Sequence, residues 1–314
     1  MSLELKNYSI DRKIFESSHY VIYEVTRLID GEKLVIKFMN SEYPSVEMQT
    51  KFRYASRMQS LFSSPFIIEI IDSIKSGHTP GMVMERGPDS LLSQLDGSPM
   101  NLADALDLAI ELVHGIAEIH SKKIVHKNIC PETILWNKKN KELKITNFSL
   151  ATEILYDNPL SCQSSPEGNL AYLPPEQSGR INRFVDYRAD FYSLGITLFE
   201  VFTGKRPFEA TDISDWIYSH IAKIPPRPES VEHSIPKTIS KIISRLIEKD
   251  AEKRYQSSAA LLGDLTRCKK ELTTEGEVSL FNIAAKDLSG NFTIPQTIYG
   301  RRKELKIWLL IRYL

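Results

Sequence analysis

The hydrophobic pattern changes character about a third of the way along the chain. The first part alternates short runs of β-branched residues with turn residues, and two such runs flank Asp30-Gly31, a strong hairpin signal. One stretch in this part is polar and compatible with a helix. The predicted strands are 21–28, 33–39, 67–74 and 81–86, and the predicted helix lies within 44–61. This pattern indicates a small, mostly antiparallel sheet with one helix.

From Asn101 onward, apolar residues recur at helical spacing. Asn101 is a good N-cap for the first of these helices, and Lys122 and Lys123 suit its negative end. The further predicted helices are 189–203, 213–223, 237–248 and 257–271, with short strands at 133–136 and 142–146 and a long loop at 158–169. The predicted fold class is α+β, with a β-rich part followed by a helical part.

Composition and charge narrow the class of protein. Hydrophobic residues make up 42% of the 314 residues, which is ordinary for a globular protein. Lys plus Arg and Asp plus Glu both number 40, so charge gives no reason to expect nucleic acid or anionic lipid as a partner. The three cysteines lack CxxC spacing, and no apolar run approaches the roughly 20 residues that a membrane helix needs. We expect a cytoplasmic protein without membrane insertion.

Six short motifs occur along the two parts in a characteristic order. They are 35–37 (VIK), 126–134 (HKNICPETI), 147–149 (NFS), 173–176 (LPPE), 190–195 (DFYSLG) and Arg254. In this order and spacing the motifs resemble those of the protein-kinase domain. The resemblance implies a two-lobed protein-kinase-like fold, with a small β-rich lobe and a larger helical lobe.

One segment narrows the resemblance further. Residues 172–208 are very similar to the kinase-like domain that opens hybrid sensor histidine kinases of bacteria and fungi, where an ATPase module, a GAF sensor and a histidine-kinase core follow. Residues 294–305 resemble the entry into that ATPase module, although the chain contains no GxxxxGK[ST] motif. We therefore expect a small lobe at 1–86, a large lobe at 87–272, a linker at 273–291 and the beginning of a truncated AAA-like ATPase module at 292–314.

The positions that carry the chemistry of a kinase are substituted. The resemblance places Asn128 where kinases have the aspartate that accepts the substrate proton, and Asn147 where they have the metal-binding aspartate. Cys130 replaces the catalytic-loop lysine, and Thr133 replaces the asparagine that holds the second metal. An amide cannot act as a general base, and magnesium prefers carboxylates. We predict no intact catalytic residue, no metal site and no required cofactor.

The positions that bind the nucleotide in kinases are altered as well. The resemblance assigns the glycine-rich loop to 15–22, which contains no glycine, so Ser17 and Tyr20 should hinder the approach of phosphates to the backbone. Lys37 stands at the position that contacts nucleotide phosphate, with Ile22 and Glu85 at the nucleotide pocket. Bound ATP would therefore depend on Lys37 and would lack magnesium.

The residues that hold the fold are retained. The resemblance implies that Glu176 pairs with Arg254, that Asp190 accepts hydrogen bonds from the catalytic loop, and that His126 has a structural role beside Asn147. This asymmetry between fold and chemistry favours a pseudokinase.

Three functional hypotheses remain open on the sequence. The first is a catalytically inactive kinase-like module that regulates or scaffolds protein partners or adjacent domains in two-component stress signalling. The second is an active Ser/Thr kinase with altered motifs that binds ATP through Lys37. The third is a truncated gene product without an independent role, which the abrupt end at 307–314 suggests.

Overall fold

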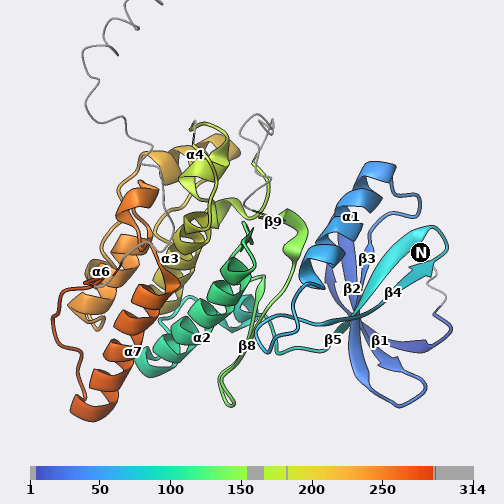
Figure 1. Ribbon diagram of the computed structural model, residues 1–314, viewed down its shortest axis with the longest axis horizontal. Coiled ribbons are helices and arrows are strands. Elements are labelled where there is room, and N and C mark those ends of the chain that lie inside the picture. Colours follow the sequence, from blue (N-terminus) through green and yellow to red (C-terminus); the bar gives the residue numbers. More distant parts are fainter. Residues whose placement is uncertain (1–4, 154–165, 182, 286, 288–314) are drawn as a thin grey trace, which may run out of the picture.

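The computed structural model describes residues 5–153, 166–181, 183–285 and Asp287. A five-stranded sheet with helix α1 forms one lobe, and the remaining helices form a larger lobe beside it (Figure 1). The predicted α+β, two-lobed arrangement is therefore confirmed. The predicted ATPase-type segment at 292–314 lies outside the described residues.

The small lobe contains one antiparallel sheet with the strand order β1-β2-β3-β5-β4. Its strands are Tyr8–Glu16 (β1), Tyr20–Arg27 (β2), Lys33–Met39 (β3), Ile70–Ser76 (β4) and Thr79–Glu85 (β5). The central strand β3 buries Leu34, Ile36 and Phe38 on one face, which pack with Val25 and Val83. Period-2 burial puts Lys37 on the opposite face, toward the other lobe.

Strand β1 was not among the predicted strands. Eight of its nine residues are exposed, because it is an edge strand that pairs only with β2. The run Asp11-Arg12-Lys13 therefore gives no alternation of apolar and polar positions. Two register irregularities along β1, next to Arg12 and Phe15, also interrupt any regular pattern and protect the edge from further pairing.

Helix α1 (Val46–Gln59) lies against the sheet and reaches the large lobe. Ser45 is its N-cap and accepts a hydrogen bond from the Met48 amide at 3.2 Å. Its buried residues are Ala55, Met58 and Gln59, and Met58 belongs to the hydrophobic core of the large lobe. The helix therefore connects the two lobes, and it contacts the turn Phe148–Leu150 of the large lobe.

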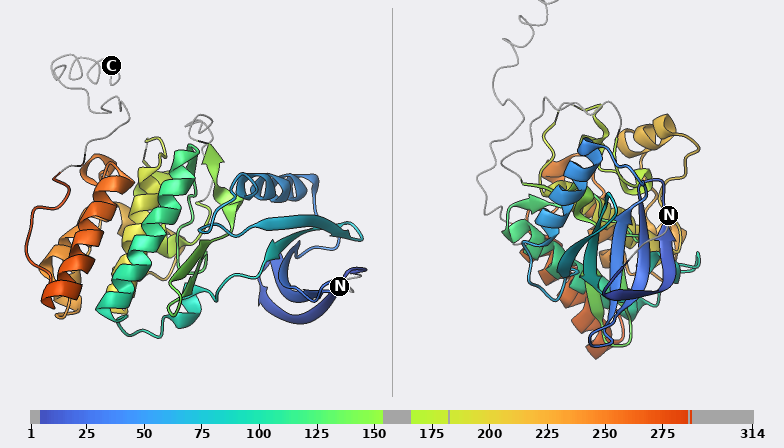
Figure 2. Two further views of the ribbon diagram at one scale, coloured as in Figure 1. Left: turned by 60° about the horizontal axis from the view of Figure 1, so that its bottom comes forward. Right: turned by 90° about the vertical axis from the view of Figure 1, so that its right-hand side faces the viewer.

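The large lobe is built around helix α3, which buries almost every residue along its length. Its helices are Leu102–Ser121 (α2), Arg188–Thr203 (α3), Ile213–Ile221 (α4), Pro228–Val231 (α5), Lys237–Leu246 (α6) and Ser258–Glu275 (α7). Four short 3-10 turns relevant here are Leu91–Gln94, Phe148–Leu150, Leu170–Tyr172 and Pro175–Ser178. Figure 2 shows α2, α3 and α7 side by side, as their packing contacts also indicate.

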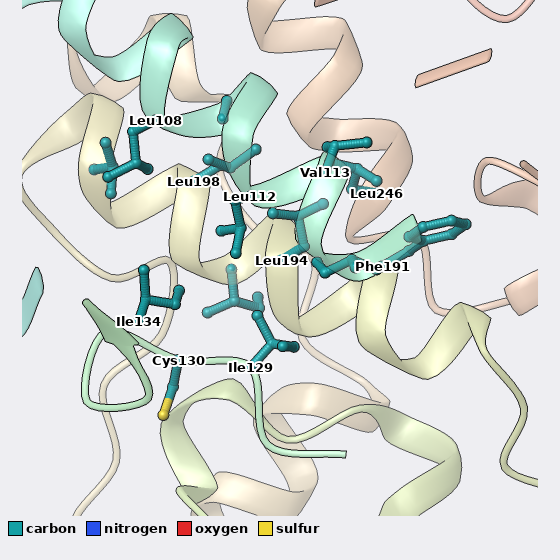
Figure 3. Packing of buried hydrophobic residues seen from close by; sticks show 14 of the residues in the cluster. Leu108, Leu112, Val113, Ile129, Cys130, Ile134, Phe191, Leu194, Leu198 and Leu246 are labelled. Atoms are coloured by element: carbon teal, nitrogen blue, oxygen red, sulfur yellow. The ribbon is translucent and has the colours of Figure 1, made fainter. Parts of the chain in front are cut away.

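Close packing in this core depends on small side chains at defined points. A Cβ atom on Gly195 of α3 would lie 2.6 Å from the Leu246 Cβ of α6, so only glycine permits this approach of the two helices. Figure 3 shows Leu112, Leu194 and Leu198 packed above Ile129, Cys130 and Ile134. The catalytic-loop position is thus supported directly by the core of the large lobe.

Four short strands form two antiparallel pairs in the large lobe, and one of these strands also contacts the small lobe. These strands are Ile124–Val125 (β6), Ile134–Asn137 (β7), Glu142–Ile145 (β8) and Thr152–Glu153 (β9), with β6 paired to β9 and β7 paired to β8. Ile67, ahead of β4, forms a parallel bridge to Ile145. Because Ile67 and Ile68 pair with β8 and not with β5, the strand of the small lobe begins at Ile70, later than predicted.

The segment predicted to be a linker begins inside helix α7, which runs to Glu275. After Gly276, Val278, Phe281 and Ile283 pack against the hydrophobic core of the large lobe. Whether 273–291 also joins this lobe to a further domain stays a prediction. Among the helices that the structure describes, none combines the length and hydrophobicity needed to cross a bilayer.

Candidate functional site

Lys37 lies where the two lobes meet, at the place that is called the cleft below. It stands on the central strand β3, opposite Ile22 of β2, and is only 7% exposed. Its ammonium group donates a hydrogen bond to Asn147 Oδ1 at 3.0 Å. No carboxylate in the described part of the chain lies within ion-pair distance of it, and burial lowers its pKa to about 8. The lysine is therefore a poorly compensated buried cation.

Tyr20 covers this lysine. The Lys37 Nζ atom lies 3.8 Å from the centroid of the Tyr20 ring, and that ring stacks on Phe15 at 5.6 Å. Burial raises the pKa of Tyr20, and a hydrogen bond with the Asn147 side chain opposes the rise. The aromatic ring thus occupies the space beside the lysine where the resemblance places nucleotide phosphates.

The turn between β1 and β2 holds Tyr20 in this position. The Ser17 amide donates to the Tyr20 carbonyl at 2.9 Å, and the Ser17 hydroxyl oxygen accepts from the Tyr20 amide at 3.2 Å. A serine-closed turn replaces the glycine-rich loop of the resemblance, so these backbone amides are already engaged. The sequence identified Tyr20 as an obstacle to phosphate, but only the structure shows its ring on Lys37.

Asn147 adopts a left-handed backbone conformation, with φ 67° and ψ 67°. Asparagine tolerates this region better than most residues, because its short polar side chain can bond locally. Immediately after it, the Phe148 ring packs against His126 at 4.8 Å and against Phe62 at 5.4 Å. These ring contacts connect the segment just after α1 to the catalytic-loop position.

The polar side chains of the catalytic-loop position hold backbone. Asn128 Oδ1 accepts from the Asn169 amide at 3.2 Å, which ties the loop to the segment after the long loop. The Thr133 hydroxyl donates to the Asn128 carbonyl at 2.8 Å and accepts from the Cys130 amide at 3.2 Å. Both side chains therefore support the loop conformation and do not point freely into the cleft.

Cys130 is fully buried, and burial raises the pKa of its thiol to about 11. A thiol protonated at neutral pH is a weak nucleophile and a weak metal ligand. Cys130 therefore acts as a small core residue beneath the loop (Figure 3).

Asp190 at the start of α3 organises the catalytic loop. Its carboxylate accepts hydrogen bonds from the His126 amide at 2.9 Å and the Lys127 amide at 2.8 Å, and from His120 Nε2 at 2.8 Å. Burial alone would raise the pKa of Asp190. The hydrogen bond from His120, the electrostatic interaction with that ring and the hydrogen bond from the His126 amide together bring the pKa below its usual value. The loop is thus fixed by a buried carboxylate whose acceptor sites are used.

His126 is a structural group in this arrangement. Its Nε2–H donates to the Thr146 carbonyl at 3.2 Å, and its Nδ1 accepts from the Asn128 amide at 3.3 Å. These two bonds require the neutral ring, and burial lowers the pKa of His126 accordingly. The histidine joins the catalytic loop to the strand end that carries Asn147.

Glu176 and Arg254 form a buried ion pair. Two hydrogen bonds of 2.6 and 2.9 Å connect the guanidinium to the carboxylate, and Arg254 also donates to the Arg188 carbonyl at 2.8 Å. The side chains are 0% and 5% exposed. This geometry anchors the segment around Glu176 to the start of α3 and to the turn before α7.

The region around the end of β5 carries charged contacts that the sequence did not reveal. Glu24 of β2 accepts from Arg12 of β1 at 2.5 Å and from Arg86 at 2.9 Å, just after β5. Glu85, predicted to line the nucleotide pocket, accepts from Lys144 at 2.8 Å. Ile22, the other predicted pocket residue, lies half-buried on β2. Cross-strand register, visible only once β1 is placed, brings the Glu24 network together.

The side chains at the positions where the resemblance places the metal ligands of kinases do not fit a magnesium ion. The oxygen of Asn147 receives the Lys37 hydrogen bond, and the Thr133 hydroxyl is engaged with loop backbone. Within the described ranges, no group of three or more His, Cys, Asp or Glu residues is arranged to hold a metal. Neutral amide and hydroxyl oxygens offer little to an ion that prefers carboxylates.

The geometry of a cleft between two lobes, a buried β3 lysine and an Asp190-fixed loop agrees with the comparisons to known proteins. The family model of the protein kinase domain matches residues 8–264. The chain belongs to the protein kinase family.

Bacterial kinases are among the relatives of this kinase-family chain. It is 29% identical over 252 residues to serine/threonine-protein kinase pkn2 of Myxococcus xanthus, and 27% identical over 261 residues to serine/threonine-protein kinase PrkC of Bacillus subtilis. A probable serine/threonine-protein kinase of Clostridium perfringens is 26% identical over 250 residues. These alignments cover 77%, 82% and 79% of the chain, but only 30%, 40% and 35% of the relatives.

Proposed function

We propose that this kinase domain is a pseudokinase that works by binding and does not transfer phosphate. The observation that carries the proposal is the Tyr20 ring on Lys37, with the Lys37 ammonium bonded to the Asn147 amide. The ammonium group that should contact phosphate is thus already engaged by the protein itself, although no carboxylate neutralises its charge. The substitutions Asn128 and Thr133 support the same conclusion, because their polar atoms stabilise the loop.

We further propose that the domain regulates or scaffolds adjacent domains or protein partners in two-component stress signalling, within or beside a hybrid sensor histidine kinase. The support for this part is the similarity of residues 172–208 to the domain that opens those proteins. The intact Glu176–Arg254 and Asp190 contacts keep a rigid large lobe available for docking. We expect the cytoplasm as its compartment, and neither nucleic acid nor membrane as its partner.

Nucleotide binding by the full chain tests the proposal. Unfolding temperature is measured with millimolar ATP, with and without Mg²⁺. A ligand present at 100 times its Kd stabilises a protein by about 2.7 kcal/mol, which such a measurement detects readily. We expect no shift for the natural sequence. A magnesium-dependent shift, together with phosphate transfer that Lys37→Met abolishes, would show that the pseudokinase proposal is wrong.

A matched pair of variants tests the role of Tyr20. Tyr20→Gly removes the ring from Lys37, whereas Tyr20→Phe keeps the ring and removes only the hydroxyl. We expect Tyr20→Gly to gain magnesium-independent ATP binding and Tyr20→Phe to remain without it. Equal behaviour of the two variants would show that the ring does not block the site.

The relatives favour a second candidate, an active Ser/Thr kinase. PrkC and pkn2 bear that activity in their names, and the edge-to-face contact of Phe148 with His126 is present. Under this alternative, Tyr20 leaves the cleft when ATP binds through Lys37. It predicts that Lys37→Met removes both the ATP-dependent stabilisation and any phosphate transfer by the purified chain.

A further inference from the structure

The chain continues past the part matched by the kinase family model and returns to the large lobe. We call residues 277–285 and Asp287 the C-terminal strap. It follows α7 after Gly276 and lies against α6 and α7. The family match ends at residue 264, inside α7, so the strap is an addition to the matched domain.

The near end of the strap is held by polar contacts to both helices. The Ser279 carbonyl accepts from the Thr238 hydroxyl of α6 at 2.6 Å, and the Ser279 amide donates to Glu271 of α7 at 2.9 Å. The Phe281 ring then lies 3.9 Å from the Arg267 guanidinium. These contacts fix where the strap begins to run back along α7.

The far end is held by one buried carboxylate. Asp287 accepts from the Gln256 amide at 2.8 Å and from the Ser257 hydroxyl at 3.0 Å, and its side chain is 2% exposed. Ser257 is the N-cap of α7, so the charge of Asp287 also lies near the positive end of that helix. Arg245 of α6 lies 3.8 Å from the same carboxylate, so Asp287 joins the strap to both α6 and α7.

Gln256 connects this attachment to the Glu176 anchor. Its side chain accepts from Arg188 at 2.9 Å and donates to the Arg254 carbonyl at 2.8 Å. Arg254 in turn holds Glu176, and the Arg188 carbonyl accepts from Arg254. One residue therefore touches the strap through its backbone amide and the arginines around the buried ion pair through its side chain.

Between its two ends the strap combines firm contacts with exposed positions. The Ala284 amide donates to Asp264 at 2.7 Å, and Ile283 packs against the core. Leu280 is 64% exposed, and Ala284 has a φ of 54°, a left-handed conformation that an alanine adopts only with strain. Exposed, strained segments with few buried contacts open locally without unfolding the whole domain. Local opening of this segment would break the contacts that Asp287 makes.

We propose that docking of the C-terminal strap at Asp287 controls the rigidity of the segment 170–178 through Gln256 and the Glu176–Arg254 pair. Release of the strap, by a force or a partner acting on the chain that follows, loosens the anchor at Glu176. The contacts made by the strap are thereby coupled to the rigidity of residues 170–178. The proposal is independent of whether the cleft binds ATP or transfers phosphate.

Hydrogen exchange of the full chain, followed by mass spectrometry, tests this coupling. The reporters are the amides of Tyr172, Leu173 and Gln177, which donate to local carbonyls. Asp287→Ala should speed exchange in the strap and, about tenfold, at the reporters. Ala284→Gly relieves the strained conformation and should slow exchange at both places.

Two controls separate coupling from general loosening. Thr238→Val weakens only the near end of the strap, so the reporters should keep their protection. Gln256→Ala retains the backbone amide that binds Asp287 but removes the side-chain connection, so adding Asp287→Ala to it should no longer change the reporters.

The outcomes are decisive in both directions. Fast exchange in the strap with unchanged reporters in Asp287→Ala would overturn the proposal, as would equal reporter loss in Thr238→Val. If Asp287→Ala does not fold, Ala284→Gly decides: a slower strap with unchanged reporters also overturns the proposal.

Discussion

Two buried charged sites in this molecule have opposite character. In the large lobe, Arg254 and Glu176 match each other with two hydrogen bonds, and Asp190 uses its carboxylate for the loop amides. In the cleft, Lys37 is equally buried but meets an amide and an aromatic ring. The comparison teaches that buried charge in this chain is matched by an opposite charge or by backbone amides where it fixes the fold, whereas the charge of Lys37 has no such match.

The largest expected effect comes from breaking the matched pair. Arg254→Met leaves Glu176 buried without its partner, and such a loss typically costs about 3–5 kcal/mol. The free energy of unfolding, measured by urea titration, should fall by about that amount. The double variant Arg254→Met with Glu176→Leu should recover a large part of the loss. A double variant no more stable than the single one would contradict the view that the unpaired charge causes the damage.

The next effect concerns the loop carboxylate. Asp190→Asn should reduce the free energy of unfolding by about 1–3 kcal/mol, because an amide accepts less strongly from the two loop amides. Since the folded pKa of Asp190 lies below its unfolded value of 3.8, the stabilisation is present above pH 3.8 and declines as pH falls toward the folded pKa. Urea titrations between pH 2 and 6 should therefore show a shallower acid slope for the variant.

A substitution of the buried cation in the cleft should raise the free energy of unfolding, in contrast to the two substitutions above. Lys37→Met removes a buried cation that has no carboxylate partner, so at pH 7 it should stabilise the protein by about 1–2 kcal/mol, after loss of the Asn147 bond is counted. The folded pKa of about 8 lies below the unfolded 10.5. The unfolded state therefore binds more protons between these values, and stability of the natural sequence should rise with pH across that window.

The difference between the two sequences, measured by urea titration at pH 7 and pH 10, isolates this lysine from other groups. The advantage of Lys37→Met should shrink as pH rises. A variant that is less stable than the natural sequence at pH 7 would show that Lys37 is well compensated in the cleft.

The smallest effect is expected at an exposed pair. Lys51 of α1 lies 3.4 Å from Glu167, and their side chains are 62% and 38% exposed. Glu167→Gln should change the free energy of unfolding by less than about 0.5 kcal/mol, and 1 M salt should abolish the difference. The pair joins the small lobe to the large lobe. A larger effect in a urea titration would mean that a contact between the lobes, and not burial, determines how much an ion pair stabilises this protein.

Local sequence was enough to predict most of the elements. The hairpin around Asp30-Gly31, the cap at Asn101 and the helical periodicity of α2, α3, α6 and α7 depend on neighbours in sequence, and the structure has these elements. Strand β1 was missed because its pairing with β2, not its own pattern, makes it a strand. Edge strands exposed on both faces carry little periodic signal.

For the candidate site, sequence by itself determined which chemical groups are available: amides at 128 and 147, a hydroxyl at 133, and no glycine at 15–22. Only the tertiary structure decided how they are used. Tyr20 covers Lys37, Asn147 accepts a hydrogen bond from Lys37, and Asp287 accepts one from the Gln256 amide. Side-chain identity is local, whereas burial, desolvation and hydrogen-bond partners arise from segments brought together by folding, which no local pattern records.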